Sequence, residues 1–351
     1  MKTVLACIAI AAIGCGPSKR GDDTSPTTHI EIEPADATVT IVNGAAVVED
    51  YTATLVTASG DRSDVTASTT FTVADSTYGS WTGPALTVTG GAAGPTQIVA
   101  SSGANMGMTS LTVMVQGFRN DGAVPANAAD LFGAATENAA IAPTLAYPAN
   151  GVTIPPNLGE LDVHWQGASD DLFEVEMHNQ YVDLKIYKAG SGPVYTDYLA
   201  SEWYALASTH SELTLTVAGL VTANPAQKGT SAPQTVEVTN EDIAGGMYYW
   251  TNEPTQGIMR YDMSTPDVPP ASFFTNPAQP TSCVGCHGLS RDGTKIALTL
   301  DSGDGRGTIF DVASYNVMVP YATNPQYWNF ATFTPDASEL VTVFEGQMSL
   351  R

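Results

Sequence analysis

One alternating stretch sets the fold class of this chain: YTATLV at residues 51–56, closed by the turn residues Ser59-Gly60-Asp61. Alternation of this kind is typical of a strand that buries one face. The stretch HIEIE at 29–33 alternates in the same way, and Asn43-Gly44 is a hairpin signal. Short strands separated by turn residues, at intervals of about 8 to 12 residues, predict a β-sandwich over residues 29–117.

A second series of alternating strands predicts a second β-sandwich over residues 141–265. Its clearest strands are LDVHW at 161–165, with a core tryptophan, and the aromatic MYYW at 247–250, which we expect to close the sandwich. The alanine-rich stretch 118–140 between the sandwiches reads as a connector with a short helix at 127–135.

The last segment contains a repeat. SRDGTKIAL at 290–298 is echoed by TPDASELVTV at 334–343, and Asp292 and Asp336 are 44 residues apart. That period fits one blade of a β-propeller, so residues 290–351 are expected to form an incomplete propeller-like segment. The predicted class is therefore all-β, with two tandem β-sandwiches followed by this segment. Because a lone blade lacks neighbours, we expect partial exposure of several apolar side chains: Leu298, Ile309, Phe310, Phe333, Val341 and Phe344.

Three resemblances accompany this reading. The segment DVT at 64–66, followed by Phe71, Gly79 and TSLTV at 109–113, resembles bacterial immunoglobulin-like repeats, which implies a spacer or adhesive module without catalytic residues. The order of the V-x-W and Y-Y-W strands resembles a fibronectin type III-like sandwich. The pattern S-x-D-G-x-x-I-A resembles TolB-like propeller repeats.

The N-terminus indicates export. Met1-Lys2 precedes an apolar run over 3–14, which is too short to span a bilayer but suits a signal peptide over residues 1–14. The run ends in Ala12-Ile13-Gly14-Cys15, which resembles the lipobox of bacterial lipoproteins. This resemblance implies a diacylated Cys15, a flexible tether over 15–28, and a protein anchored to a bacterial membrane in the cell envelope, at the outer membrane or cell surface. An ordinary cleaved signal and a buried apolar strand are the alternatives.

Composition argues against nucleic acid as a partner. The formal net charge is −23, from 36 acidic and 13 basic residues, and no basic run occurs. Such a chain repels phosphate backbones and anionic membrane surfaces. No phosphate loop, Gly-x-Ser-x-Gly motif or zinc-hydrolase helix is present in the sequence. Positive indications of a hydrolase or transferase are thus lacking, and we expect an electron carrier or a binding protein.

The motif with the most chemistry is CVGCH at residues 283–287. C-x-x-C-H is the attachment signature of a c-type haem, because two thiols form thioethers to the vinyl groups while the next residue offers an imidazole to the iron. Cys283, Cys286 and His287 are therefore predicted to bind haem c in a loop over 266–289. Met318 and Met348 are candidates for the sixth ligand. A disulfide between the two cysteines and a metal site remain alternatives.

Two functions follow. In the first, the chain is an anchored haem protein for electron transfer or redox sensing, with the sandwiches as a stalk and a redox partner. In the second, it is a non-enzymatic cell-surface scaffold that binds a surface protein or glycan, and the C-x-x-C-H forms only a disulfide.

Overall fold

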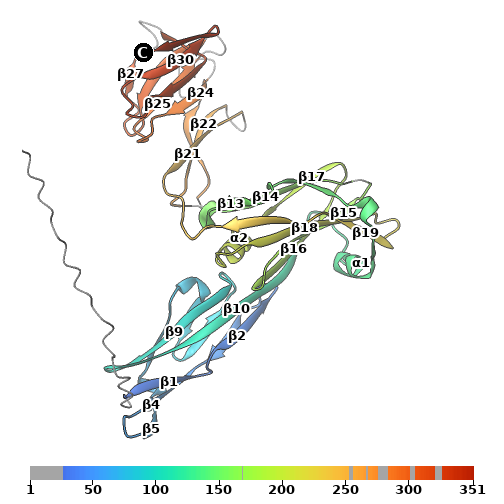
Figure 1. Ribbon diagram of the computed structural model, residues 1–351, viewed down its shortest axis with the longest axis vertical. Coiled ribbons are helices and arrows are strands. Elements are labelled where there is room, and N and C mark those ends of the chain that lie inside the picture. Colours follow the sequence, from blue (N-terminus) through green and yellow to red (C-terminus); the bar gives the residue numbers. More distant parts are fainter. Residues whose placement is uncertain are drawn as a thin grey trace, which may run out of the picture. The chain divides into compact units, whose positions relative to one another are not determined.

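The computed structural model describes residues 27–167, 169–252, 256–265, 268–275, 284–300, 305–320 and 326–351. Strands account for 55% of the described residues and helices for 9%, which confirms the all-β class. The chain forms two compact units that divide within strand β10 (Figure 1).

The first unit is a β-sandwich built from β1 to β9 and the first part of β10. Its core comes from the buried positions of alternating strands, including Ile41 and Leu86, and from a cluster of three rings. In that cluster Tyr51 lies 5.5 Å from Trp81, and Phe71 stacks on Trp81 at 5.4 Å between centroids. The strands are β1 (His29–Glu33), β2 (Ala37–Val42), β3 (Val47–Asp50), β4 (Thr52–Val56), β5 (Arg62–Asp64), β6 (Thr70–Val73), β7 (Gly79–Thr82), β8 (Ala85–Val88), β9 (Gly94–Ser102) and β10 (Asn105–Asp121).

Strand β10 extends further than the sequence analysis expected. Residues 118–121, assigned there to the connector, continue the strand and pair in parallel with β16 (Val182–Ala189). Here Phe118 is exposed, whereas Arg119 and Asp121 find charged partners described below. The side chains of this segment alternate between the two faces of the sheet, and the charged ones on the inner face are paired. The segment therefore stays in the sheet.

The second unit begins with another β-sandwich. One sheet has the order β12-β14-β17, and the larger sheet contains β18-β15-β16 at its centre. The sheets face each other through Trp165 and Phe173, whose rings lie 5.3 Å apart. The strands are β11 (Thr136–Glu137), β12 (Thr144–Tyr147), β13 (Val152–Ile154), β14 (Leu161–Gln166), β15 (Leu172–His178), β16, β17 (Pro193–Tyr198), β18 (Leu213–Leu220), β19 (Gln227–Thr230) and β20 (Gln234–Val238).

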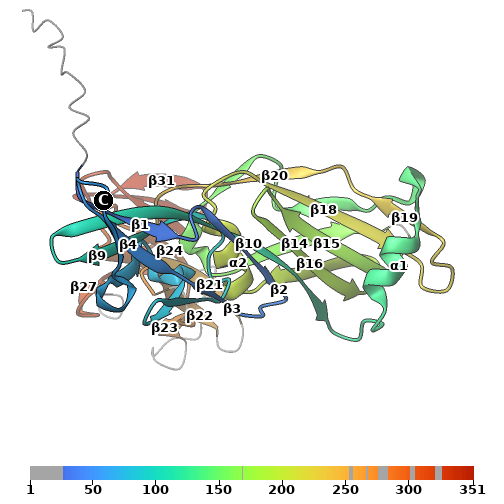
Figure 2. The same cartoon turned by 90° about the horizontal axis from the view of Figure 1, so that it is seen from below.

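Two short helices cover this sandwich (Figure 2). Helix α1 (Ala128–Ala134) is the helix expected near 127–135, and it packs Phe132 against Leu172 and Tyr187 of the larger sheet. Helix α2 (Ala200–Ala207) buries Trp203, whose indole Nε1 donates to the main-chain oxygen of Pro156 at 2.9 Å.

Three antiparallel meanders complete the second unit, and the last two contain residues 290–351, the segment expected to be an incomplete propeller. The described residues form no closed propeller. The first meander is β21 (Gly246–Thr251), β22 (Gly257–Asp262) and β23 (Ala271–Thr275). The second is β24 (Val284–Leu289), β25 (Lys295–Leu300), β26 (Arg306–Asp311) and β27 (Val317–Val319), with β28 (Gln326–Tyr327) also on β26. The third is β29 (Phe330–Phe333), β30 (Leu340–Phe344) and β31 (Gln347–Leu350).

The aromatic strand at 247–250 lies in the first meander as part of β21 and pairs with β22, so it does not close the second sandwich. The first meander supplies Ile258 and Phe274 to a core shared with the second. Leu298 and Phe310 are consequently 0% and 3% exposed, so the prediction that these two remain partly exposed was wrong. Ile309, Phe333, Val341 and Phe344 are half-buried, as expected.

Candidate functional site

The C-x-x-C-H motif leads into the first strand of the second meander. Cys283 lies outside the described residues, whereas Cys286 and His287 lie on β24. This strand lies against β22 of the first meander and β29 of the third. At Gly288 the approach to β29 is so close that a Cβ atom would meet the main-chain oxygen of Ala331 at 2.5 Å. Strand β24 is therefore held between two neighbouring sheets.

A β-bulge interrupts β24 at Cys286. Gly285 pairs with Thr299 and His287 pairs with Leu298, which leaves Cys286 as the extra residue. Bulges redirect side chains and often occur beside functional groups. The side chain of Cys286 is exposed, whereas Val284, two residues earlier, is fully buried in the core. The bulge thus gives a solvent-accessible thiol on an otherwise packed strand.

The imidazole of His287 is half-buried and reaches the first meander. Its Nε2 atom lies 3.1 Å from the main-chain oxygen of Tyr248. Because a carbonyl oxygen only accepts, Nε2 carries the hydrogen in this contact and Nδ1 is the basic nitrogen. Beside it, the indole Nε1 of Trp250 donates to the main-chain oxygen of Val284 at 2.8 Å. These two contacts join β24 to β21 around the motif.

Two of the three residues that would hold a covalent haem lie side by side on β24. The chain offers an accessible thiol at Cys286 and, as the next residue, an imidazole partly shielded from water, which are the groups that such attachment needs. Trp250 provides an exposed aromatic surface nearby. If His287 held a haem iron through Nε2, it would lose its hydrogen bond to Tyr248, whereas Nδ1 could bind the iron with that bond in place.

The structure does not bring the candidate sixth ligands beside His287. Met318 lies on β27, the fourth strand of the sheet in which β24 is first. Three strand spacings of about 4.8 Å place these strands roughly 14 Å apart. Met348 is 75% exposed and pairs with Val343. Both lie on the face of the third meander that points away from the second meander. Cys15, the predicted lipidation site, lies outside the described residues.

The described residues lack two features. Within them no group of three or more His, Cys, Asp or Glu side chains is arranged to hold a metal ion. In the same part of the chain, no helix has the length and apolar character needed to cross a membrane.

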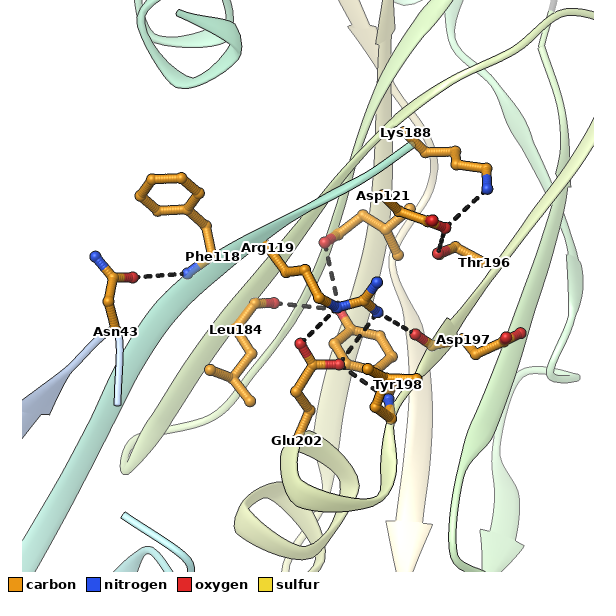
Figure 3. A network of polar contacts seen from close by, with 12 residues as sticks. Asn43, Phe118, Arg119, Asp121, Leu184, Lys188, Thr196, Asp197, Tyr198 and Glu202 are labelled. Carbon is orange, nitrogen blue, oxygen red and sulfur yellow. Dashed lines mark hydrogen bonds and ion pairs between the residues drawn. The ribbon is translucent and has the colours of Figure 1, made fainter. Parts of the chain in front are cut away.

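A polar network in the second sandwich was not predicted from the sequence (Figure 3). Arg119 Nε donates to Glu202 Oε1 at 2.9 Å, and both side chains are largely buried. The same guanidinium donates to the main-chain oxygen of Asp197. Asp121 accepts from Lys188 Nζ at 2.8 Å and from Thr196 Oγ1 at 2.7 Å. The network ties β10 to β16, β17 and α2, which is a structural role.

A pair of carboxyl groups borders this network. Asp162 and Asp197 face each other across β14 and β17. The hydrogen bond between them, together with burial, raises the pKa of Asp197 to about 6. Only the strand register brings these residues together, so local sequence carries no signal of the pair.

Comparisons with known proteins give no family for this chain. No protein-family model matches it, and no curated protein matches it. Solved structures that match parts of it include a chimeric titin Z1Z2-Z1Z2 tandem carrying an exogenous GRGDS peptide from fibronectin, at 13% identity over 60% of this chain and 98% of that chain, with a TM-score of 0.17.

Two further matches are TolB from Acinetobacter baumannii and the fibronectin(III)-like modules of CbhA from Clostridium thermocellum. TolB is 13% identical over 68% of this chain and 61% of its own length, with a TM-score of 0.24. The CbhA modules are 15% identical over 60% of this chain and 93% of theirs, with a TM-score of 0.19. The fold described above therefore rests on the strand pairing and cores of this chain.

Proposed function

We propose that this chain is a haem-carrying protein for electron transfer or redox sensing, in which Cys283, Cys286 and His287 hold one c-type haem. The observation that supports this proposal is the pairing on β24 of an exposed thiol at a bulge with a half-buried imidazole in the next position. These are the two kinds of group that the C-x-x-C-H signature requires, and neither is consumed by the core.

A haem bound here supplies reversible one-electron chemistry at its iron. Cys283 and Cys286 would hold the group through thioether bonds, and His287 would offer a ring nitrogen to its iron. The carbonyl of Tyr248 orients the imidazole in the free chain. A hydrogen bond on the second ring nitrogen makes a ligating histidine more basic, so retention of the Tyr248 contact would favour the oxidised iron.

Anchoring is the second part of the proposal. A lipid on Cys15 would hold the protein at a bacterial membrane, with the two sandwiches lying between the anchor and the C-x-x-C-H motif along the chain. The proposal rests on the residues 12–15, and it agrees with the exported compartment in which haem is joined to cysteines. We also propose that the sandwiches belong to the immunoglobulin-like and fibronectin type III-like classes, and that residues 290–351 are TolB-like propeller repeats.

The test is production of the full chain with active cytochrome maturation machinery. A denaturing gel stained for haem should show a band that survives boiling, because thioethers do not dissociate. Cys283→Ala with Cys286→Ala should abolish it. His287→Ala should shift the Soret band by removing an axial ligand, and His29→Ala, at an exposed histidine of the first sandwich, should not. A colourless protein with both thiols in a disulfide would contradict the proposal and support the scaffold alternative.

A further inference from the structure

The second sandwich carries a row of exposed rings on one sheet face. In the sheet β12-β14-β17, Leu161, Val163 and Trp165 point into the core, so the residues between them point outward. On that outer face Tyr147 pairs with His164, and His164 pairs with Tyr195. Their ring centroids are 5.5 and 5.8 Å apart along the row.

The rings are accessible along the whole row. Tyr147 is 46% and Tyr195 is 63% exposed, and the side chain of His164 is 49% exposed. Cross-strand aromatic pairs stabilise a sheet, which explains their pairing. It does not explain why all three lie on the solvent side, where exposed aromatic groups with polar tips are typical of binding surfaces.

Hydrogen-bonding side chains border the row on both sides. The next cross-strand pair on one side is Asp162 with Asp197, and on the other side Gln166 pairs with Thr144. The carboxylate of Asp197 points away from Arg119, which bonds only its main-chain oxygen (Figure 3). Lys188, whose Nζ lies 5.9 Å from the Tyr195 ring, is already paired with Asp121.

We propose that this face, formed by Tyr147, His164 and Tyr195 with their polar borders, binds a glycan of neutral sugars. The apolar C–H faces of pyranose rings stack on aromatic rings, and their hydroxyl groups donate to carboxylates and exchange hydrogen bonds with amides. An open row of three rings suits consecutive sugars of a polymer. The bordering carboxylates and the net charge of −23 disfavour anionic glycans. The proposal is independent of the haem site.

Native affinity electrophoresis of the full chain tests the proposal. The probes are gels containing soluble neutral polysaccharides (β-glucan, glucomannan, xylan and galactomannan), with alginate as the anionic control. We expect retardation by at least one neutral polymer and none by alginate. Tyr195→Ala and Tyr147→Ala should each weaken the apparent affinity about tenfold, as stacking residues do. Tyr327→Ala, at a partly exposed tyrosine on β28, should not change the apparent affinity.

Tyr195→Phe separates recognition from folding. It keeps the ring, so it should retain at least half of the retardation while the circular dichroism of all variants matches that of the parent chain. Absence of retardation by every neutral polymer, stronger retardation by alginate, or retardation unchanged by both alanine variants would each overturn the proposal. Binding of a protein partner that both variants abolish, without any polysaccharide binding, would overturn it as well.

Discussion

Gly307 lies directly against the indole of Trp328, because a Cβ atom built on this glycine would come within 2.2 Å of the ring. Trp328 is 2% exposed and shares a core cluster with Ala297 and Leu340, so it has little room to move. The contact joins β26 to the segment that enters the third meander. It is possible only because Gly307 has no side chain.

The first prediction follows from that contact. Gly307→Ala should destabilise the propeller-like segment by about 1–3 kcal/mol, because an added methyl group in a closed core forces neighbouring atoms apart. Denaturant unfolding monitored by tryptophan fluorescence measures the change. As a control, Gly133→Ala in α1 has open space around the new methyl group and should be neutral or stabilising. An equal effect of the two substitutions would contradict the prediction.

Loss of the Arg119 guanidinium should destabilise the second sandwich. Arg119→Ala leaves Glu202 and the main-chain oxygen of Asp197 without a charged donor in a largely buried place, at a cost of about 2 kcal/mol. Urea titration gives the free energy of unfolding. The matched control is Arg62→Ala, which breaks the exposed ion pair with Glu31 and should change little. A larger loss for Arg62→Ala would argue against the role assigned to burial.

The stability of the second sandwich should depend on the protonation of Asp197. The folded state raises the pKa of this group from 3.8 to about 6, so folding favours the protonated form. The contribution of Asp197 to the free energy of unfolding is fully present below about pH 4, and it is lost as the pH rises through 6. Melting temperatures between pH 4 and 7 should therefore fall less for Asp197→Asn than for the parent chain. Asp162→Asn, which removes the cause of the shift, should flatten the profile similarly, and parallel profiles would refute this account.

The outer face of the third meander should promote self-association. Phe330, Val343 and Met348 form one cross-strand row on it, and Val341 and Leu350 lie in the next. Phe330, Met348 and Leu350 are each at least 60% exposed. Met348→Glu should raise the monomer fraction in sedimentation velocity, because a charge opposes burial of an apolar sheet face. Met106→Glu on β10, at a similarly exposed methionine, should leave the fraction unchanged. Identical sedimentation of all three proteins would count against the prediction.

The sequence predicted the all-β class and the sandwiches, because period-2 alternation and turn residues act locally. It assigned the strand at 247–250 to the second sandwich instead of the first meander, because an aromatic strand can pack equally well in either of these sheets. It also underestimated the burial of Leu298 and Phe310, which the first meander covers. That meander has no S-x-D-G repeat, so its sequence carried no sign that it would pack there.

Residues of the candidate site were predictable only in part. C-x-x-C-H identified Cys286 and His287 by spacing alone. The bulge at Cys286, the carbonyl of Tyr248 and the distant strand of Met318 depend on strand register and on packing between sheets. The ring row of Tyr147, His164 and Tyr195 has the same origin, because its members come from three strands up to 48 residues apart in the chain.

Because Cys286 is the extra residue in β24, a modification of its sulfur is independent of the strand pairing. Gly285 and His287 keep their partners on β25 without any help from Cys286, whose side chain faces solvent. A bulky adduct on this sulfur therefore displaces no rung of the ladder, and an unmodified thiol leaves no gap in it. The proposed attachment at Cys286 could therefore come before or after the meander folds.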